Sequence, residues 1–130
     1  MDREKVREQT MQIIFQMDAA GDYDYTNISV VPENEKILSQ KQAVTTLVII
    51  RDHIEEIDDI IASNTTNWSA GRIAKTDLAI LRNAVAEMMF REDIPNAVSI
   101  NEAVKLAKKY GDDKSYAFVN SVLSKINKNI

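Results

Sequence analysis

The sequence predicts an all-α fold, and three observations support this prediction. Apolar residues recur at helical spacing through most of the 130-residue chain, and the clearest stripe contains Leu47, Ile50, Ile54, Ile57 and Ile61. No stretch alternates apolar and polar residues over the length of a strand. Only three glycines and two prolines interrupt these patterns. A chain of this length is expected to form one domain, so we predict five to seven helices around one core.

The first helix is predicted over residues 2–19. Asp2 can cap its amino end, and Gly21 lies just beyond its carboxyl end. The stripe expected to face the core contains Val6, Thr10, Ile13 and Met17. Met11 and Phe15 lie off this stripe on the helical wheel. Either the helix packs on two sides, or these two residues belong to a partner-binding surface, since exposed apolar patches mark interfaces.

A loop and then one or two helices are predicted over the next part of the chain. Residues 20–32 are rich in turn-forming residues. In this loop, Tyr23 and Tyr25 either anchor the segment or stack on a ligand. Residues 33–66 contain the isoleucine stripe, and residues 39–42 have the pattern of a capping box at a helix start.

A central, buried helix is predicted to follow a hinge at residues 64–67. Trp68 is expected to plug the core next to this hinge. Residues 75–93 are apolar nearly all round, with Thr76 as the expected cap. Two charged residues stand out in this helix, because a buried charge must be paired. We predict one structural polar network that joins Arg82 and Glu87 to Asn101, Glu102 or neighbouring backbone groups.

The carboxyl-terminal stretch, residues 94–126, is predicted to form a helical hairpin. Ser99 and Glu102 have capping-box spacing at the start of its first helix. Gly111 is expected to provide a left-handed exit, after which residues 112–115 can cap the second helix. Cationic and aromatic residues gather around the turn: Lys105, Lys108, Lys109, Lys114, Tyr110, Tyr116 and Phe118.

Composition argues against several kinds of site. The chain lacks cysteine and has a single histidine, His53, so we expect no metal site, and an enzyme is the weaker class of function. No phosphate-binding glycine motif or zinc-protease motif occurs. The formal net charge of −4 argues against indiscriminate coating of nucleic acid but is compatible with a local basic patch. The charged amino terminus does not resemble a secretory signal.

A set of spaced motifs covers essentially the whole chain. It begins with Arg7, Glu8, Gln12 and Phe15 and continues with Trp68, Arg72, Ile80-Leu81-Arg82 and Glu87. It ends with Ile94-Pro95, Ile100-Asn101-Glu102-Ala103, Leu106-Ala107-Lys108, Tyr110-Gly111, Phe118-Val119-Asn120 and Val122-Leu123. In this order and spacing, the motifs closely resemble NusB, a family of bacterial transcription antitermination factors.

The resemblance implies a NusB-like fold of two small helical bundles, with about seven helices in one compact domain over residues 1–130. The first bundle would span residues 1–66 and the second residues 67–130. The resemblance also implies a cytoplasmic adaptor with no cofactor. Its partners would be NusE, a small-subunit ribosomal protein, and single-stranded boxA RNA, in an elongation complex of RNA polymerase with NusA and NusG. Some members of the family form homodimers.

Roles for individual residues follow from the resemblance and from the position of Met11. The RNA-facing residues would be Arg3, Lys5, Arg7, Lys108, Tyr110, Lys114, Phe118 and Asn120. The partner-binding residues would be Met11, Phe15 and Asp77. Cationic side chains would attract phosphates, and bases would stack on Tyr110 or Phe118. Phe118 could instead belong to the core, and Asn120 could form a structural hydrogen bond.

Two other classes of function remain open from the sequence. One is a helical protein–protein adaptor that makes no contact with RNA of its own. A steep salt dependence of RNA binding would argue against that class, because phosphate contacts release counterions. The other is a small hydrolase, for which turnover that survives extensive purification would be the distinguishing result.

Overall fold

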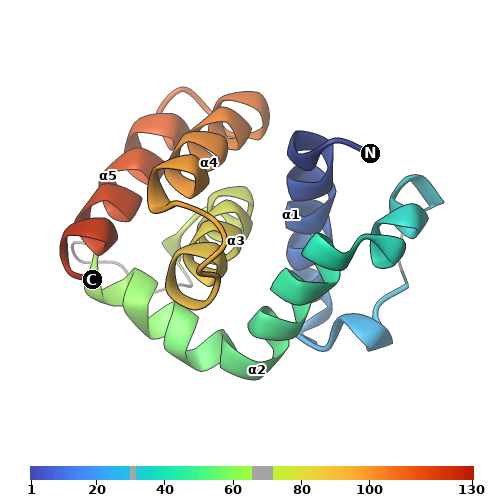
Figure 1. Cartoon of the computed structure of the whole chain (residues 1–130). Helices are drawn as coiled ribbons and strands as arrows, with labels where there is room; N and C mark the ends of the chain where they lie inside the picture. The colour runs from blue at the N-terminus through green and yellow to red at the C-terminus, as the bar shows by residue number, and fades with distance from the viewer. Residues whose placement is uncertain (30–31, 66–71) are drawn as a thin grey trace.

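The computed structural model describes residues 1–29, 32–65 and 72–130, so the prediction for Trp68 lies outside the described residues. Five α-helices and two short 3-10 helices form the described part of the chain (Figure 1). The α-helices are α1 (Arg3–Ala20), α2 (Lys41–Ser63), α3 (Lys75–Phe90), α4 (Asn96–Tyr110) and α5 (Ser115–Lys128), and the 3-10 helices are η1 (Tyr25–Asn27) and η2 (Pro32–Ser39). No described residue lies in a strand, so the all-α prediction is confirmed, with five α-helices rather than about seven.

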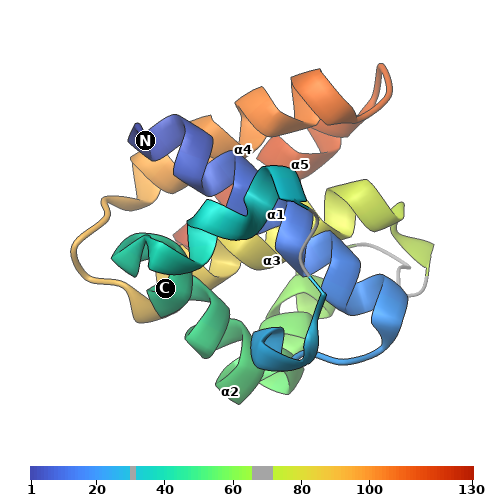
Figure 2. The ribbon, with the colours of Figure 1, turned by 90° about the vertical axis from the view of Figure 1, so that its right-hand side faces the viewer.

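Helix α3 lies at the centre of the fold and contacts α1, α2, α4 and α5. Figures 1 and 2 show α1 lying across α3 on one side and the α4–α5 hairpin on another. Every residue of α3 from Asp77 to Met88 is buried. This burial confirms the prediction that a helix with apolar residues nearly all round is the central one. The division into bundles at residues 1–66 and 67–130 stays a prediction.

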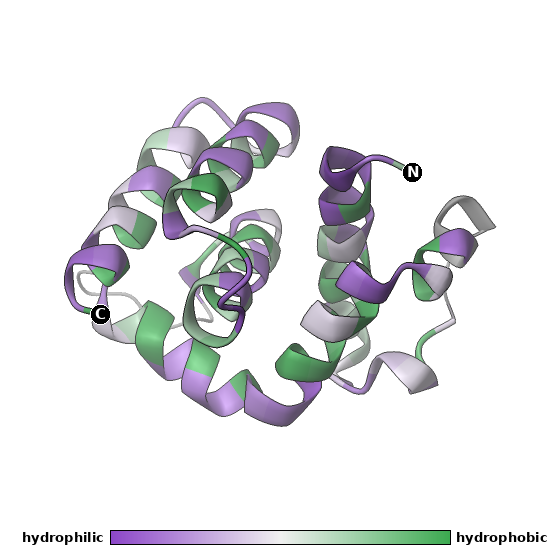
Figure 3. Cartoon of the chain, viewed as in Figure 1, coloured by the Kyte–Doolittle hydropathy of each residue, from purple (hydrophilic) through white to green (hydrophobic). Residues whose placement is uncertain are grey.

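The hydrophobic core collects side chains from all five α-helices. Ile13, Ile14 and Met17 of α1 are fully buried, and removing each such side chain from water contributes roughly 1.5–3 kcal/mol. In Figure 3 the carboxyl half of α1 is correspondingly hydrophobic, whereas its first turns are strongly hydrophilic. None of the helices in the described ranges is long and apolar enough to cross a membrane.

Met11 also belongs to the core, with 2% of its surface exposed, so its assignment to a partner-binding surface is wrong. Helix α1 packs against α2 and η2 as well as against α3. More than one side of α1 is therefore covered, and a residue off the main stripe can still be buried.

Both predicted ends of α1 are confirmed to within one residue. Asp2 is the N-cap, and its Oδ1 accepts a hydrogen bond of 2.7 Å from the backbone N–H of Lys5. Gly21 has a φ of 67°, a left-handed conformation that glycine adopts at low cost. Its N–H donates to the carbonyl of Asp18. Orphan backbone groups are thus satisfied at both ends of the helix.

The other predicted caps are wrong, and α5 likewise begins after Lys114 with no side-chain cap. Helix α2 begins after Ser39 with no side-chain cap, and α3 begins before Thr76. Ser99 lies inside α4, where its hydroxyl donates to Glu87 of α3 at 2.8 Å. A capping pattern describes only neighbours in sequence, so it cannot reveal a partner that another helix brings to the same side chain.

Gly111 is required for a different reason from the predicted one. Its φ is −91°, so its backbone is not left-handed. A Cβ at this position would collide with the side chain of Ser115 and would lie 2.7 Å from the carbonyl oxygen of Ala107. The close approach of α4 and α5 therefore demands glycine. Asp112 orders the same turn, since its Oδ1 accepts a 2.9 Å hydrogen bond from the N–H of Lys114.

Helix α2 is kinked at His53, whose φ of −130° and ψ of 22° interrupt the helical geometry. The imidazole stacks on Phe90 of α3, with 4.2 Å between the ring centroids. Its Nδ1 lies 3.0 Å from Glu56. Among the described residues, no three His, Cys, Asp or Glu side chains are grouped to hold a metal ion. We therefore assign His53 to the packing of α2 against α3.

Candidate nucleic-acid interface

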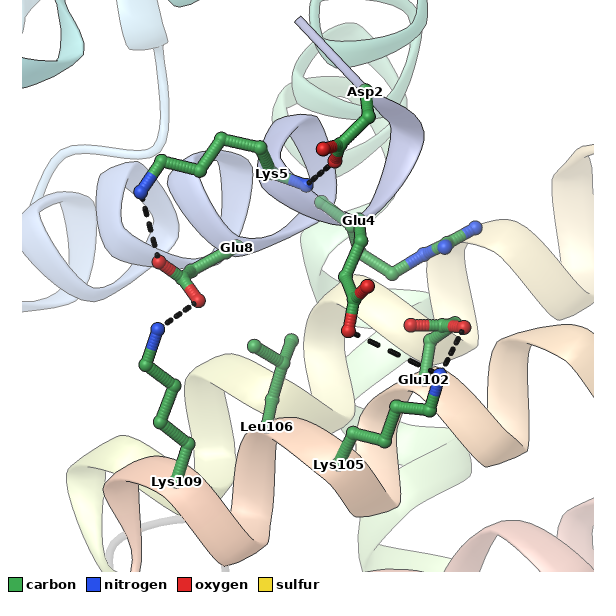
Figure 4. A pocket seen from close by; sticks show the side chains of 9 residues that line it. Asp2, Glu4, Lys5, Glu8, Glu102, Lys105, Leu106 and Lys109 are labelled. Carbon is green, nitrogen blue, oxygen red and sulfur yellow. Dashed lines mark hydrogen bonds and ion pairs between the residues drawn. The ribbon is translucent and has the colours of Figure 1, made fainter.

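A polar groove lies between the amino-terminal half of α1 and the carboxyl-terminal half of α4 (Figure 4). This α1–α4 groove has a volume of about 240 Å³. It is lined by Asp2, Glu4, Lys5, Arg7, Glu8, Glu102, Lys105, Leu106 and Lys109. Ion pairs cross it: Lys109 Nζ lies 2.7 Å from Glu8 Oε2, and Lys105 Nζ lies 3.9 Å from Glu4 Oε1. Two helices that are far apart in the sequence thus lie side by side and form one charged surface.

Glu8 lines this groove and has 8% of its surface exposed. Its carboxylate contacts Lys109 and also Lys5, whose Nζ lies 3.5 Å away. Burial alone would raise the pKa of Glu8, but hydrogen bonds from Lys109 and Tyr110 and the charges of the two lysines outweigh burial and lower this pKa. The carboxylate is therefore ionised at neutral pH and holds both ammonium groups.

The turn between α4 and α5 carries exposed cations and aromatic rings. We call Lys108, Tyr110, Lys114 and Tyr116 the turn cluster, and all four side chains are exposed. The hydroxyl of Tyr110 accepts a 2.9 Å hydrogen bond from Nε2 of Gln12, which joins the turn to α1. Lys108 Nζ lies 5.3 Å from the ring centroid of Tyr116. Exposed cations beside aromatic faces suit phosphate binding and base stacking.

Phe15 lies on the side of α1 that borders the α1–α4 groove. Lys5, Glu8, Gln12 and Phe15 are three or four residues apart, so they share one side of the helix. The ring is 41% exposed. An exposed aromatic side chain beside a polar groove suits a protein interface. The exposure agrees with a role in partner binding, which stays a prediction.

Arg7 has a structural role that the sequence did not predict. Its guanidinium donates two hydrogen bonds to Glu87 of α3, at 2.8 and 3.0 Å. The hydroxyl of Ser99 donates to the same carboxylate, so α1, α3 and α4 are joined at one point. Glu87 is only 3% exposed, and removing Arg7 would leave this buried charge with the Ser99 hydroxyl but without the cation paired with it here. We therefore assign Arg7 to the fold rather than to the RNA surface.

The other predicted basic residues of α1 lie on two different sides. Lys5 lines the α1–α4 groove, where it pairs with Glu8. Arg3 is exposed but lines a second groove, beside Arg91 and Ile94. A single basic platform that unites Arg3 with the lysines of the turn is therefore not formed.

Arg82 and Glu87 belong to two separate networks, not to the single network that the sequence predicted. Five positions along a helix turn two side chains about 140° apart, so they face different neighbours. Asn101 is exposed, and Glu102 pairs with a lysine of its own helix. Their predicted membership in the buried network is wrong for this reason.

Arg82 joins three helices through a buried ion-pair network. It donates two hydrogen bonds to Asp58 of α2, at 2.9 and 2.8 Å, and one of 2.9 Å to Asp18 of α1. Tyr23 donates to Asp18, and its ring lies 5.0 Å from the guanidinium carbon. Lys75 Nζ lies 3.3 Å from the same aspartate. Of the two roles that the sequence left open for Tyr23, anchoring the loop is the one the structure supports.

Asp77 is buried in the first turn of α3, with 7% of its surface exposed. Its Oδ2 accepts a 3.2 Å hydrogen bond from the hydroxyl of Ser115, but its Oδ1 has no hydrogen-bond partner among the residues described here. Burial raises the pKa of Asp77; the Ser115 hydrogen bond opposes this rise, and the charge of Asp112 adds to it. The carboxylate is thus poorly satisfied, and its role in partner binding stays a prediction.

We expect Asp77→Asn to stabilise the fold by about 1 kcal/mol at pH 7, because a neutral amide costs less to bury than a carboxylate. A raised folded-state pKa means that Asp77 favours the fold most when protonated, and this contribution is lost as pH rises through the folded pKa. The advantage of asparagine should therefore shrink as pH falls through the folded-state pKa of Asp77 and should be smallest below the ordinary pKa of 3.8. Urea unfolding at pH 7 and at a pH below 3.8 measures the gain in the free energy of unfolding. An equal gain at the two pH values would contradict the explanation.

Phe118 and Asn120 occupy different environments on α5. Phe118 is half-buried and packs against the core. Asn120 is exposed. Phe118 therefore fits the alternative of a core side chain with an accessible edge, while a contact of either residue with RNA stays a prediction.

Two contacts at these sites were missed by sequence reasoning. Glu8 and Lys109 are 101 positions apart, and a single sequence carries no signal of such a pairing. Asp58 and Arg82 are 24 positions apart, and Asp58 is a main partner of this arginine. The apolar pattern around Asp58 shows only which side of α2 faces the core. It could not reveal that Arg82 of α3 lies opposite this aspartate.

Sequence comparisons agree with this architecture. Residues 4–128 match the NusB family. A transcription antitermination protein NusB from Clostridium perfringens is 40% identical, over all of this chain and 99% of the relative. A protein of the same name from Finegoldia magna is 38% identical, over 97% of this chain and 93% of the relative.

Solved structures are also similar to this one. T. maritima NusB has a TM-score of 0.87 and 32% identity, over 98% of this chain and 92% of that chain. A crystal structure of the antitermination factors NusB and NusE in complex with double-stranded RNA matches with a TM-score of 0.76 and 28% identity, over the full length of both chains. With its sequence matched from end to end and its fold shared, this chain belongs to the NusB family.

Proposed function

We propose that this chain is a transcription antitermination factor that pairs with NusE and binds boxA RNA in nascent transcripts, notably of ribosomal RNA operons. It would act with RNA polymerase, NusA and NusG to allow read-through of terminators. The name shared by its relatives supports the activity. The solved complex of NusB and NusE with RNA supports the two kinds of partner.

The observation that carries this proposal is the nearness of the turn cluster to the face of α1 that bears Phe15. Lys108 and Lys114 would neutralise phosphates. Tyr110 would stack on a base, a contact worth roughly 1–3 kcal/mol. Gln12 links Tyr110 to α1, and Phe15 follows three residues later on the same side. A partner that packs on Phe15 would therefore extend the RNA-binding surface without a break.

The charge of the chain favours binding by the heterodimer. The isolated protein carries a net charge of −4, and the α1–α4 groove contains as many acidic as basic side chains. Nonspecific electrostatic attraction to phosphate is correspondingly weak. NusE would supply much of the missing positive charge.

The proposed role is that of a non-catalytic, cytoplasmic adaptor that needs no metal or cofactor. The packing of His53 supports a non-catalytic role, since this residue is the one histidine of the sequence and its imidazole stacks on Phe90. We also propose that residues 1–66 and 67–130 act as two bundles of one unit. A homodimer that used Phe15 would compete with NusE for the same side chain.

A gel-shift titration of boxA RNA tests the function, with the chain alone, with NusE alone and with both. We expect the pair to bind at least about tenfold more tightly than either protein alone, with a steep dependence on salt concentration. A scrambled RNA of equal length is the control. Retention of NusE in a pull-down together with no RNA binding by the pair would instead establish the adaptor that makes no contact with RNA.

A further inference from the structure

In the free protein, the positive charges of the α1–α4 groove are balanced by carboxylates of the same groove. Four of its lining side chains are acidic and four are basic. Figure 4 shows Lys5, Glu8 and Lys109 joined in one row of ion pairs, and Glu4, Lys105 and Glu102 in another. A phosphate that approaches these lysines must therefore compete with a carboxylate that is already bound to them.

Glu8 is the strongest of these competitors. Its oxygen lies 2.7 Å from Lys109 Nζ, whereas the contact between Glu4 and Lys105 is 3.9 Å long. The side chain of Glu8 is 11% exposed, against 66% for Glu4. An exposed carboxylate can swing into water when phosphate arrives, but a buried one loses its compensation when its partner leaves.

We propose that Glu8 is a built-in competitor for RNA phosphate, which holds Lys109 and Lys5 until a correctly placed RNA displaces it. This inference rests on the proposed RNA-binding function. Phosphate contacts alone carry no sequence information, and base contacts supply specificity. By weakening the phosphate contacts, Glu8 makes binding depend on the additional contacts at the turn cluster and with NusE. Glu8 is in this sense a specificity-determining residue.

Glu8→Gln should tighten binding of the NusE complex to RNA by about three- to tenfold at physiological salt, as expected when one partly exposed ion pair no longer competes. It should also make the salt dependence of the affinity steeper, by up to roughly 0.7 in the logarithmic slope for each lysine released. Scrambled RNA should gain at least as much as boxA RNA, so discrimination should not improve. Fluorescence anisotropy at several salt concentrations measures all three quantities.

Glu55→Gln provides the matched control, since it makes the same change in net charge at an exposed site on α2. Its effect on RNA affinity should stay below about twofold, because charges farther away than about 8 Å are screened at physiological salt. Lys109→Gln provides the second control. In that background, Glu8→Gln should lose most of its gain, because the lysine that it would release is gone.

Two results would overturn the proposal. One is a gain from Glu8→Gln no larger than that from Glu55→Gln, and the other is a gain that persists in full with Lys109→Gln. In both cases binding of boxA RNA by the wild-type pair leaves the proposed function intact. If the wild-type pair binds no RNA, the proposed function and this inference fail together. Thermal unfolding of each variant confirms that the affinities refer to folded protein.

Discussion

Replacing Arg82 with leucine should lower the free energy of unfolding by about 3–5 kcal/mol, the range observed when one partner of a buried ion pair is removed. The guanidinium is 3% exposed and forms three hydrogen bonds with Asp18 and Asp58. Without it, the partly buried carboxylates of Asp18 and Asp58 lose the cation that lies between them. Because those carboxylates belong to α1 and α2, the loss should loosen both helices from α3.

The matched control is Arg51→Leu. Arg51 pairs with Asp52 on the exposed side of α2, where solvent screening leaves an ion pair little effect on stability. Urea unfolding monitored by circular dichroism measures both variants. A loss for Arg82→Leu no larger than that for Arg51→Leu would show that Asp18 and Asp58 find other compensation in the fold.

The effect of Arg82 should also depend on pH. Burial alone would raise the pKa of Asp18, but hydrogen bonds from Arg82 and Tyr23 outweigh burial and lower it. A lowered folded-state pKa contributes stability above the ordinary value of 3.8, and this stability is lost as pH falls through the folded pKa. In Arg82→Leu, the partly buried Asp18 keeps only Tyr23 and Lys75 as partners, so its ionised form is less stabilised in the folded state. The difference between wild type and variant should therefore narrow in acid.

Local signals in the sequence predicted the helices well and their contacts poorly. Asp2 and Gly21 set the ends of α1 because both act on backbone groups within four residues of themselves. The apolar residues on nearly all sides of α3 identified it as the central helix, since a helix that packs on one side only needs apolar residues on that side only. Ser99 also matched a local cap pattern, but its partner is Glu87, on another helix.

The sequence predicted which residues belong to the candidate site but not how they are arranged in space. Met11 and Phe15 both lie off the main stripe of α1, yet one is buried and the other is exposed. A helical wheel gives the direction of each side chain but not the number of neighbours around the helix. For the same reason, the sequence could count the cations near the turn but could not show that Glu8 holds two of the neighbouring lysines.

Phe15→Asp should weaken binding of NusE by about 30-fold or more, because aromatic anchors that become buried in an interface commonly contribute 2 kcal/mol or more to affinity. The ring is 41% exposed in the free chain, so aspartate should leave the fold intact. In the complex, the same aspartate would place an unpaired charge where the partner expects an apolar surface. Isothermal titration calorimetry with NusE measures the change.

Val98→Asp is the appropriate control for Phe15→Asp, since Val98 is also 41% exposed but lies on α4. It introduces the same charge and removes a similar exposed apolar surface, so it should leave NusE affinity within about twofold of wild type. If both variants weaken binding equally, the loss reflects net charge rather than a contact with Phe15. If neither variant weakens binding, NusE binds elsewhere. The side of α1 that carries Glu8, Gln12 and Phe15 would then not connect the RNA-binding surface with NusE.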